Sequence, residues 1–141
     1  MIFTRILVPT DGTEASLRGL EVAVQLVVRY AAELVVVTVV SVPDWLARQN
    51  MEQGAIESYV EGNAQKVFEA VVTLLRQAGV GAELKVVVGS APESLLAEVE
   101  NSHADLVVMG RRGRDEPKDI LLGTVSDRLA RHVKVPILLV P

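Results

Sequence analysis

The residues best suited to chemistry in this sequence are three glycines and two hydroxyl residues near its C-terminal end. They form the pattern Gly-x2-Gly-x9-Gly-Thr-x-Ser, whose members are Gly110, Gly113, Gly123, Thr124 and Ser126. A glycine lets the backbone approach a ligand closely, because it carries no Cβ. The start of a helix offers backbone N–H groups and a partial positive charge, which favour an anion such as phosphate. The pattern therefore predicts a phosphate-binding loop that leads into a helix.

Two common glycine motifs do not account for this pattern. A P-loop ends in Gly-Lys followed by Ser or Thr, and the chain has no such triplet. The Rossmann fingerprint follows the first strand of its domain, whereas this pattern lies near the end of the chain. Each glycine alone could be an ordinary turn, and Thr124 or Ser126 could simply cap the helix. Together the five residues favour phosphate binding, which uses the same geometry as capping.

Alternating strands and helices must position this loop. Apolar, β-branched runs predict five strands, at Ile2–Val8, Leu34–Val40, Ala82–Val88, Ala104–Met109 and Ile137–Val140. Apolar residues at helical spacing predict four helices, at Thr13–Ala32, Ala55–Ala78, Ser90–Ser102 and Gly123–His132. Strands that alternate with helices indicate a parallel sheet with helices on both faces.

The connections between these elements carry further expectations. Ser90 followed by Glu93 is typical of a capping box at the start of the third helix. The segment Ser41–Gly54 has no clean period, so we interpret it as a loop with room for a helical turn, and a loop of this length is often functional. The first helix can be capped by any of three polar residues, Thr10, Asp11 and Thr13.

The composition excludes several classes of function. The chain has 141 residues, enough for a single domain, 1–141, with a full core. Half of its residues are hydrophobic but only 4% are aromatic, so Val, Leu, Ile and Ala must build that core. It has no cysteine, which excludes disulfides, thiol catalysis and thiolate metal sites. Its net charge of −4 argues against nucleic acid as a partner.

The sequence predicts neither a membrane span nor a secretory signal. No apolar run approaches the roughly 20 residues that a membrane-spanning helix needs. Arg5 and Asp11 interrupt what would be the apolar core of a signal peptide. No cluster of His, Asp and Glu has the spacing of metal ligands. We therefore expect a soluble cytoplasmic protein with no membrane partner and no metal site of its own.

The glycine pattern and both ends of the chain resemble the ATP-binding branch of the universal stress protein family. The resemblance rests on Arg5–Gly12, on the glycine pattern itself, and on Lys134–Pro141 at the other end. It implies an α/β fold, an open twisted five-stranded parallel sheet of the Rossmann-like, adenine nucleotide α-hydrolase-like kind, with strand order 3-2-1-4-5. In that order the chain reverses direction between strands 1 and 4. Ligands of open α/β sheets bind beyond the strand ends at such a point.

The resemblance also implies a ligand and the residues that meet it. The ligand would be ATP, or ADP or AMP, with Mg²⁺ held by the phosphates. Asp11 would contact the ribose and Val39 would pack on the adenine. For Asp11 the alternative is a turn or cap residue, and for Val39 and Met109 it is plain core. The residues implied are Pro9, Thr10, Asp11, Val39, Met109, Gly110, Arg112, Gly113, Gly123, Thr124, Val125 and Ser126.

The segment between Gly113 and Gly123 departs from the family. Asp115-Glu116-Pro117 stands where the family more often has small, hydroxyl or basic residues. Residues 111–119 include four basic and three acidic side chains, a near balance that weakens simple attraction of phosphate. The acids could instead reach a phosphate-bound Mg²⁺ through water. The arginines at 111, 112 and 114 could screen phosphate charge, or they could form a solvated surface.

Three functions stay open at this point. The first is a regulatory, stress-response role in which conformation and dimerisation depend on the nucleotide. The second is an ATPase or phosphotransferase, and the third is a dimerisation module without nucleotide. The sequence offers no Walker-type acid, so we expect at most slow ATP hydrolysis and assign no catalytic residue. The resemblance implies a homodimer through the apolar edge strand at Val135–Val140.

Overall fold

The protein folds around one parallel sheet, and its computed structural model describes residues 2–48, 53–114, 116–117 and 120–141. The strands are β1 (Arg5–Pro9), β2 (Glu33–Val40), β3 (Glu83–Val88), β4 (Leu106–Gly110) and β5 (Ile137–Val140). The helices are α1 (Glu14–Tyr30), α2 (Asp44–Arg48), α3 (Gln53–Ala78), α4 (Ala91–Asn101) and α5 (Thr124–His132). Neighbouring strands pair in parallel in the order β3-β2-β1-β4-β5, which confirms the predicted fold class.

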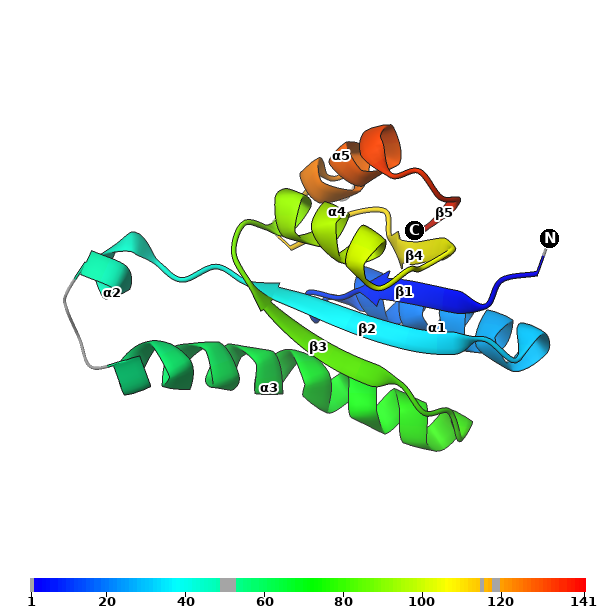
Figure 1. Cartoon of the computed structure of the whole chain (residues 1–141), viewed down its shortest axis with the longest axis horizontal. Helices are drawn as coiled ribbons and strands as arrows, with labels where there is room; N and C mark the ends of the chain where they lie inside the picture. Colours follow the sequence, from blue (N-terminus) through cyan, green and yellow to red (C-terminus); the bar gives the residue numbers. More distant parts are fainter. Residues whose placement is uncertain (1, 49–52, 115, 118–119) are drawn as a thin grey trace.

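Helices cover both faces of this sheet. In Figure 1, α4 and α5 lie above the sheet and α3 lies below it. The core on the α1 and α3 side includes Ile6, Leu20 and Val71, and the core on the α4 and α5 side includes Leu7 and Leu129. Successive residues of a strand face opposite sides, so β1 contributes to both cores and reads as a continuous apolar run. Within the described ranges, no helix is both long enough and apolar enough to cross a membrane.

The backbones of α1 and β4 lie in close contact. A Cβ added at Gly19 would lie 3.2 Å from the backbone nitrogen of Gly110. A Cβ added at Gly110 would lie 3.0 Å from the carbonyl carbon of Ala15. Because backbone atoms stand opposite both positions, only residues without a Cβ allow this approach. The contact places the N-terminal turns of α1 beside the C-terminal end of β4.

The predicted elements differ from the observed ones mainly in one connection. The segment Ser41–Gly54, predicted as a loop with room for a helical turn, contains a helical turn as the short helix α2, and it also contains the first two residues of α3. Residues 49–52 of this segment lie outside the described part of the chain. Pro43 directly precedes α2, and its carbonyl accepts the N–H groups of Leu46 and Ala47 at 3.1 Å each. A five-residue helix shows too little periodicity for its bounds to be predicted from sequence.

Two helix starts show which polar residues act as caps. Thr13 is the N-cap of α1, and its hydroxyl accepts the N–H of Ser16 at 3.2 Å. Ser90 is the N-cap of α4, but the predicted capping box is wrong, because the Ser90 hydroxyl donates to the Glu93 carboxylate at 3.0 Å instead. The pKa of Glu93 is lowered by a hydrogen bond from its own N–H, then by Ser90 and nearby Arg128, against the opposing effect of burial.

Asp105 fastens the beginning of the chain to the beginning of β4. Its carboxylate accepts the N–H and the hydroxyl of Thr4, both at 2.8 Å, and the N–H of Arg5 at 3.0 Å. The N–H of Asp105 in turn donates to the carbonyl of Arg5 at 2.9 Å. Burial acts to raise the pKa of Asp105, but these hydrogen bonds together outweigh it, and the pKa is lowered. Asp105 therefore holds β1 and β4 in register at their N-terminal ends.

Replacing Asp105 by Asn should lower the free energy of unfolding at pH 7 by about 1–3 kcal/mol, because three donors lose a charged acceptor. The matched control is Asp44→Asn, at an exposed acid of α2, which should cost less than about 0.5 kcal/mol. Urea unfolding measures both values.

The same pair of variants tests the pH dependence. Since the native pKa of Asp105 lies below its unfolded value of roughly 3.9, its stabilisation is complete above that value. It is lost as the pH falls toward the native pKa. The stability difference between wild type and Asp105→Asn should therefore shrink at about pH 3. A difference that stays constant from pH 7 to that pH would contradict a role for the Asp105 charge.

Candidate functional site

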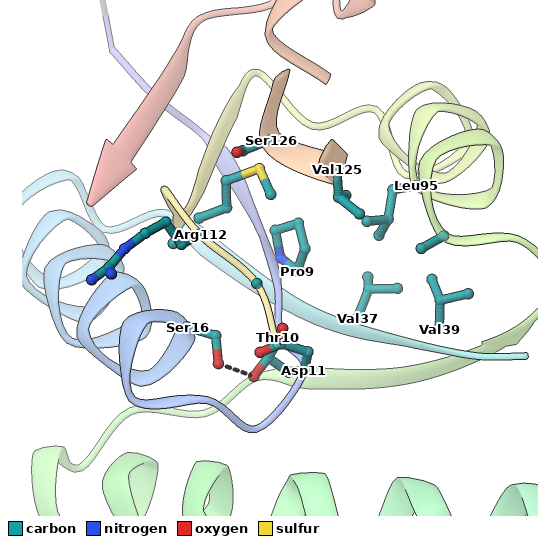
Figure 2. A pocket seen from close by; sticks show the side chains of 14 residues that line it. Pro9, Thr10, Asp11, Ser16, Val37, Val39, Leu95, Arg112, Val125 and Ser126 are labelled. Carbon is teal, nitrogen blue, oxygen red and sulfur yellow. Dashed lines mark hydrogen bonds between the residues drawn. The ribbon is translucent and has the colours of Figure 1, made fainter. Parts of the chain in front are cut away.

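A cavity opens where β1 and β4 end next to each other, and Figure 2 shows it from close by. Its lining comes from the ends of β1, β2 and β4, the loop after β4, and first turns of α1, α4 and α5. The lining residues are Pro9, Thr10, Asp11, Ser16, Val37, Val39, Ala91, Leu95, Met109, Gly110, Arg112, Gly113, Val125 and Ser126. All predicted site residues except Gly123 and Thr124 are thus brought together, and these two are the N-cap and the first residue of the adjoining helix α5.

One wall of the cavity is apolar. Val37 and Val39 lie two residues apart on β2 and therefore on the same face, and Leu95 of α4 and Val125 of α5 complete the wall (Figure 2). The cavity has a volume of about 100 Å³, less than the roughly 300–1,000 Å³ of most small-molecule sites. It therefore encloses only part of such a ligand, and the wall suits a flat, apolar-faced group.

Sequence reasoning missed four lining residues, namely Ser16, Val37, Ala91 and Leu95. The two-residue period of a strand could have found Val37 from Val39. Ala91 and Leu95 lie four positions apart on one side of α4. They line the cavity because of how α4 packs over the sheet, and no local sequence pattern predicts that packing.

The opposite side of the cavity is polar. The hydroxyls of Thr10 and Ser16 lie 3.0 Å apart and are buried. One oxygen of the Asp11 carboxylate accepts the N–H of Thr13 at 3.0 Å and its hydroxyl at 2.5 Å. The other oxygen accepts the N–H of Arg114 at 3.0 Å, and the Arg114 guanidinium donates to the Asp11 carbonyl at 2.5 Å. Asp11 is thus a turn residue that also ties the loop after β4 to the end of β1.

The third glycine lies where this loop returns to α5. A Cβ added at Gly123 would lie 3.2 Å from the nitrogen of Gly113 and 3.2 Å from a carboxylate oxygen of Glu116. The N–H of Gly123 donates to the carbonyl of Arg111 at 2.9 Å, and the Ser126 hydroxyl donates to the same carbonyl at 2.6 Å. The two ends of the loop therefore touch, and no side chain fits at position 123 without displacing its neighbours.

A carboxylate stands at the start of α5. Gly123 is the N-cap of this helix and provides no capping side chain. The N–H of Thr124 donates to the Glu116 carboxylate at 2.9 Å. The Ser126 hydroxyl is buried and donates to backbone carbonyls, so neither Thr124 nor Ser126 caps the helix as the alternative interpretation would have it. The start of α5 thus accepts an anionic group, in agreement with the field of a helix N-terminus.

The structure describes some of the charged residues in the loop after β4. The side chain of Arg112 leaves the cavity on the side opposite to Val37 and Val39 (Figure 2). Asp115 and the charged residues at 118 and 119 lie outside the described residues, and with them most of the predicted water-mediated contact to Mg²⁺. In the part of the chain that the structure describes, no three His, Asp or Glu side chains gather as metal ligands would.

Comparison with known sequences decides the family. The model of the universal stress protein family matches residues 2–141. The chain belongs to this family. A universal stress protein of Thermus aquaticus is 31% identical over 141 residues, and the match covers 99% of each chain. Universal stress protein MJ0531 of Methanocaldococcus jannaschii is 27% identical over 142 residues, a match that covers 99% of this chain and 82% of that protein.

Solved structures of the family share the fold of this universal stress protein. UspA from Lactobacillus plantarum superposes with a TM-score of 0.84 at 17% identity, over 100% of this chain and 99% of that one. A universal stress protein solved in complex with cAMP has a TM-score of 0.72 at 24% identity, over 100% and 99%. One from Archaeoglobus fulgidus, solved in complex with dAMP, has a TM-score of 0.70 at 19% identity, over all of both chains.

The geometry separates the roles of two glycines in the pattern. Gly110→Ala should lower the free energy of unfolding by about 1–3 kcal/mol, because its Cβ would press on the α1 backbone. Gly113→Ala is the matched control and should change it by less than about 0.5 kcal/mol, because its Cβ would meet only the carboxylate end of Asp11 at 3.3 Å. Urea unfolding measures the free energy of unfolding of both variants. An equal decrease in the two variants would contradict the packing role of Gly110.

Proposed function

We propose that this chain binds an adenine nucleotide in the cavity between β1 and β4 and that its conformation reports the bound nucleotide. One observation carries the proposal: an apolar wall and an anion-accepting helix start meet at the same cavity. A nucleotide has the matching halves, a flat base and charged phosphates. The family members solved with cAMP and dAMP support an adenine nucleotide as the ligand class.

In this proposal each part of the ligand has a counterpart on the protein. The adenine lies against Val37 and Val39, and the phosphates lie over Gly113 and the start of α5. The ribose hydroxyls approach Asp11. The Asp11 oxygen that accepts from Arg114 can still accept a second hydrogen bond, since a carboxylate oxygen has two lone pairs.

The nucleotide would be ATP, ADP or AMP, with Mg²⁺ carried by its phosphates. Each charge-assisted hydrogen bond contributes roughly 1.5–3 kcal/mol. Several of them, less the cost of immobilising the ligand, give a Kd on the order of micromolar. Binding would order the loop after β4, and a partner protein could read that change.

The geometry favours binding over turnover. Phosphoryl transfer needs a group that activates or positions the attacking nucleophile. Among the described residues that line the cavity, the carboxylate that could do this belongs to Asp11. This carboxylate already accepts three hydrogen bonds. The proposed role is therefore regulatory, and ATP hydrolysis would be slow.

We further propose a homodimer through β5. This strand is at one end of the sheet, and its pairing partner among the described strands is β4. Leu138 on β5 is 40% exposed, and an open apolar edge favours association with a second chain. The proposal extends the family resemblance at Val135–Val140.

Nucleotide content tests the binding proposal. Purified wild-type protein, denatured and chromatographed, should release an adenine nucleotide, and Gly123→Val should release none because its side chain would fill the loop. Gly62→Val is the matched control and should keep the nucleotide, since a Cβ at Gly62 meets nothing within 4 Å. Calorimetry with ATP and Mg²⁺ should give a Kd on the order of micromolar for wild type. If wild type neither releases nor binds an adenine nucleotide, the proposal is wrong.

Charge on the sheet edge tests the dimer. Leu138→Lys should convert the protein to a monomer in sedimentation velocity, because it places a charge on the proposed interface. The control is Leu84→Lys on β3, the opposite edge strand, where the leucine is 37% exposed. That variant should sediment as wild type does. A dimer that survives Leu138→Lys, or that both variants dissociate, rules out an interface specific to β5.

A further inference from the structure

We propose that Glu116 is a specificity-determining residue of this site. Its carboxylate competes with the phosphates of the nucleotide for the start of α5, and so it limits how much phosphate charge the site accepts. The inference rests on the proposed function, since it concerns the helix start beside that cavity.

The Glu116 carboxylate lies at the start of α5. It accepts the N–H of Thr124, the first residue of α5, at 2.9 Å. The same oxygen lies 3.2 Å from the position of a Cβ at Gly123, and the nitrogen of Gly113 lies at that distance on the same side of the glycine. The carboxylate therefore occupies the place where the two glycine turns meet, which is where the phosphates would bind.

The contact is not an ordinary helix cap. A capping side chain comes from the N-cap or from the first turn of the helix. Glu116 precedes Thr124 by eight positions and reaches it from within the loop. Its backbone is held separately, because its N–H donates to the carbonyl of Gly113 at 3.4 Å. The carboxylate can thus leave Thr124 by rotation of its own side chain while the hydrogen bond from the Glu116 N–H to Gly113 is kept.

A second carboxylate supports this interpretation of the loop. Asp11 accepts the N–H of Arg114 at 3.0 Å, just as Glu116 accepts that of Thr124. Two backbone donors on the loop and at the helix start are therefore occupied by carboxylates of the chain itself. Asp11 stays available to a ribose, but the Glu116 carboxylate and a phosphate group would need the same donor.

Charge makes the competition specific for phosphate. Two anions that compete for one N–H also repel each other, and the repulsion grows as the local dielectric constant falls. A nucleotide must expel the Glu116 carboxylate before its phosphate reaches Thr124. Adenosine carries no phosphate, so it binds on the apolar wall without disturbing Glu116. The site therefore gains less from added phosphates than its glycine loop alone would allow.

The test compares four probes, adenosine, AMP, ADP and ATP, by calorimetry without Mg²⁺ on the 141-residue chain. Glu116→Gln keeps the size of the side chain and removes its charge. It should bind ATP about tenfold more tightly than wild type, a change equal to roughly one charge-assisted hydrogen bond. Its affinity for adenosine should stay within about twofold of wild type. Glu116→Ala should likewise bind ATP more tightly than wild type and adenosine about equally. It controls for a hydrogen bond that the glutamine amide could still make to Thr124.

Glu61→Gln, at an exposed position of α3, is the control for the loss of one negative charge, and it should bind all four probes as wild type does. Thermal melting of each variant verifies that it is folded. Glu116 variants that bind ATP no more tightly than wild type, or that tighten adenosine equally, overturn the inference while the binding proposal stands. If wild type binds none of the four probes, the proposed function fails and the inference fails with it.

Discussion

The contact between the backbones of α1 and β4 determines where everything else at the site can lie. Glycine at positions 19 and 110 lets the helix and the strand approach without intervening side chains. The chain consequently leaves β4 directly over the start of α1, beside the end of β1. There Asp11 meets the N–H of Arg114, so the loop is held at its beginning by the turn that starts α1. A wider separation of α1 and β4 would leave the cavity without this polar wall.

Backbone donors and carboxylates dominate the polar half of the site. Asp11 and Glu116 each accept a backbone N–H of the loop or of α5, and the Ser126 hydroxyl donates to the carbonyl of Arg111. These contacts tie the described ends of the glycine loop to the turn before α1 and to the start of α5. A charged ligand at the start of α5 would therefore exchange one anion for another. The same contacts stabilise the loop and restrict what it binds.

The sequence predicts the sheet, its order and most of the cavity, for different physical reasons. The strands are recognisable because burial on both faces makes them continuously apolar, and the order follows from the family resemblance. The glycines are recognisable by spacing. In contrast, α2 is too short to show a period, and the position of Leu95 depends on packing across the sheet. The contact of Glu116 with Thr124 joins residues that no capping pattern relates, and only the folded loop reveals it.

The hydrogen bonds from Thr4 and Arg5 to Asp105 join β1 to β4, two strands far apart in the sequence, and this separation affects how the protein folds during synthesis. Ile6 of β1 pairs with Leu34 on one side and with Leu106 on the other. During synthesis Leu34 follows soon after Ile6, whereas Leu106 follows only after β2 and β3. The central strand of the sheet is thus an edge strand until β4 has been synthesised, and open apolar edges favour association with other chains. We therefore expect the pairing of β1 with β4, which closes a long stretch of chain, to be a slow step of folding.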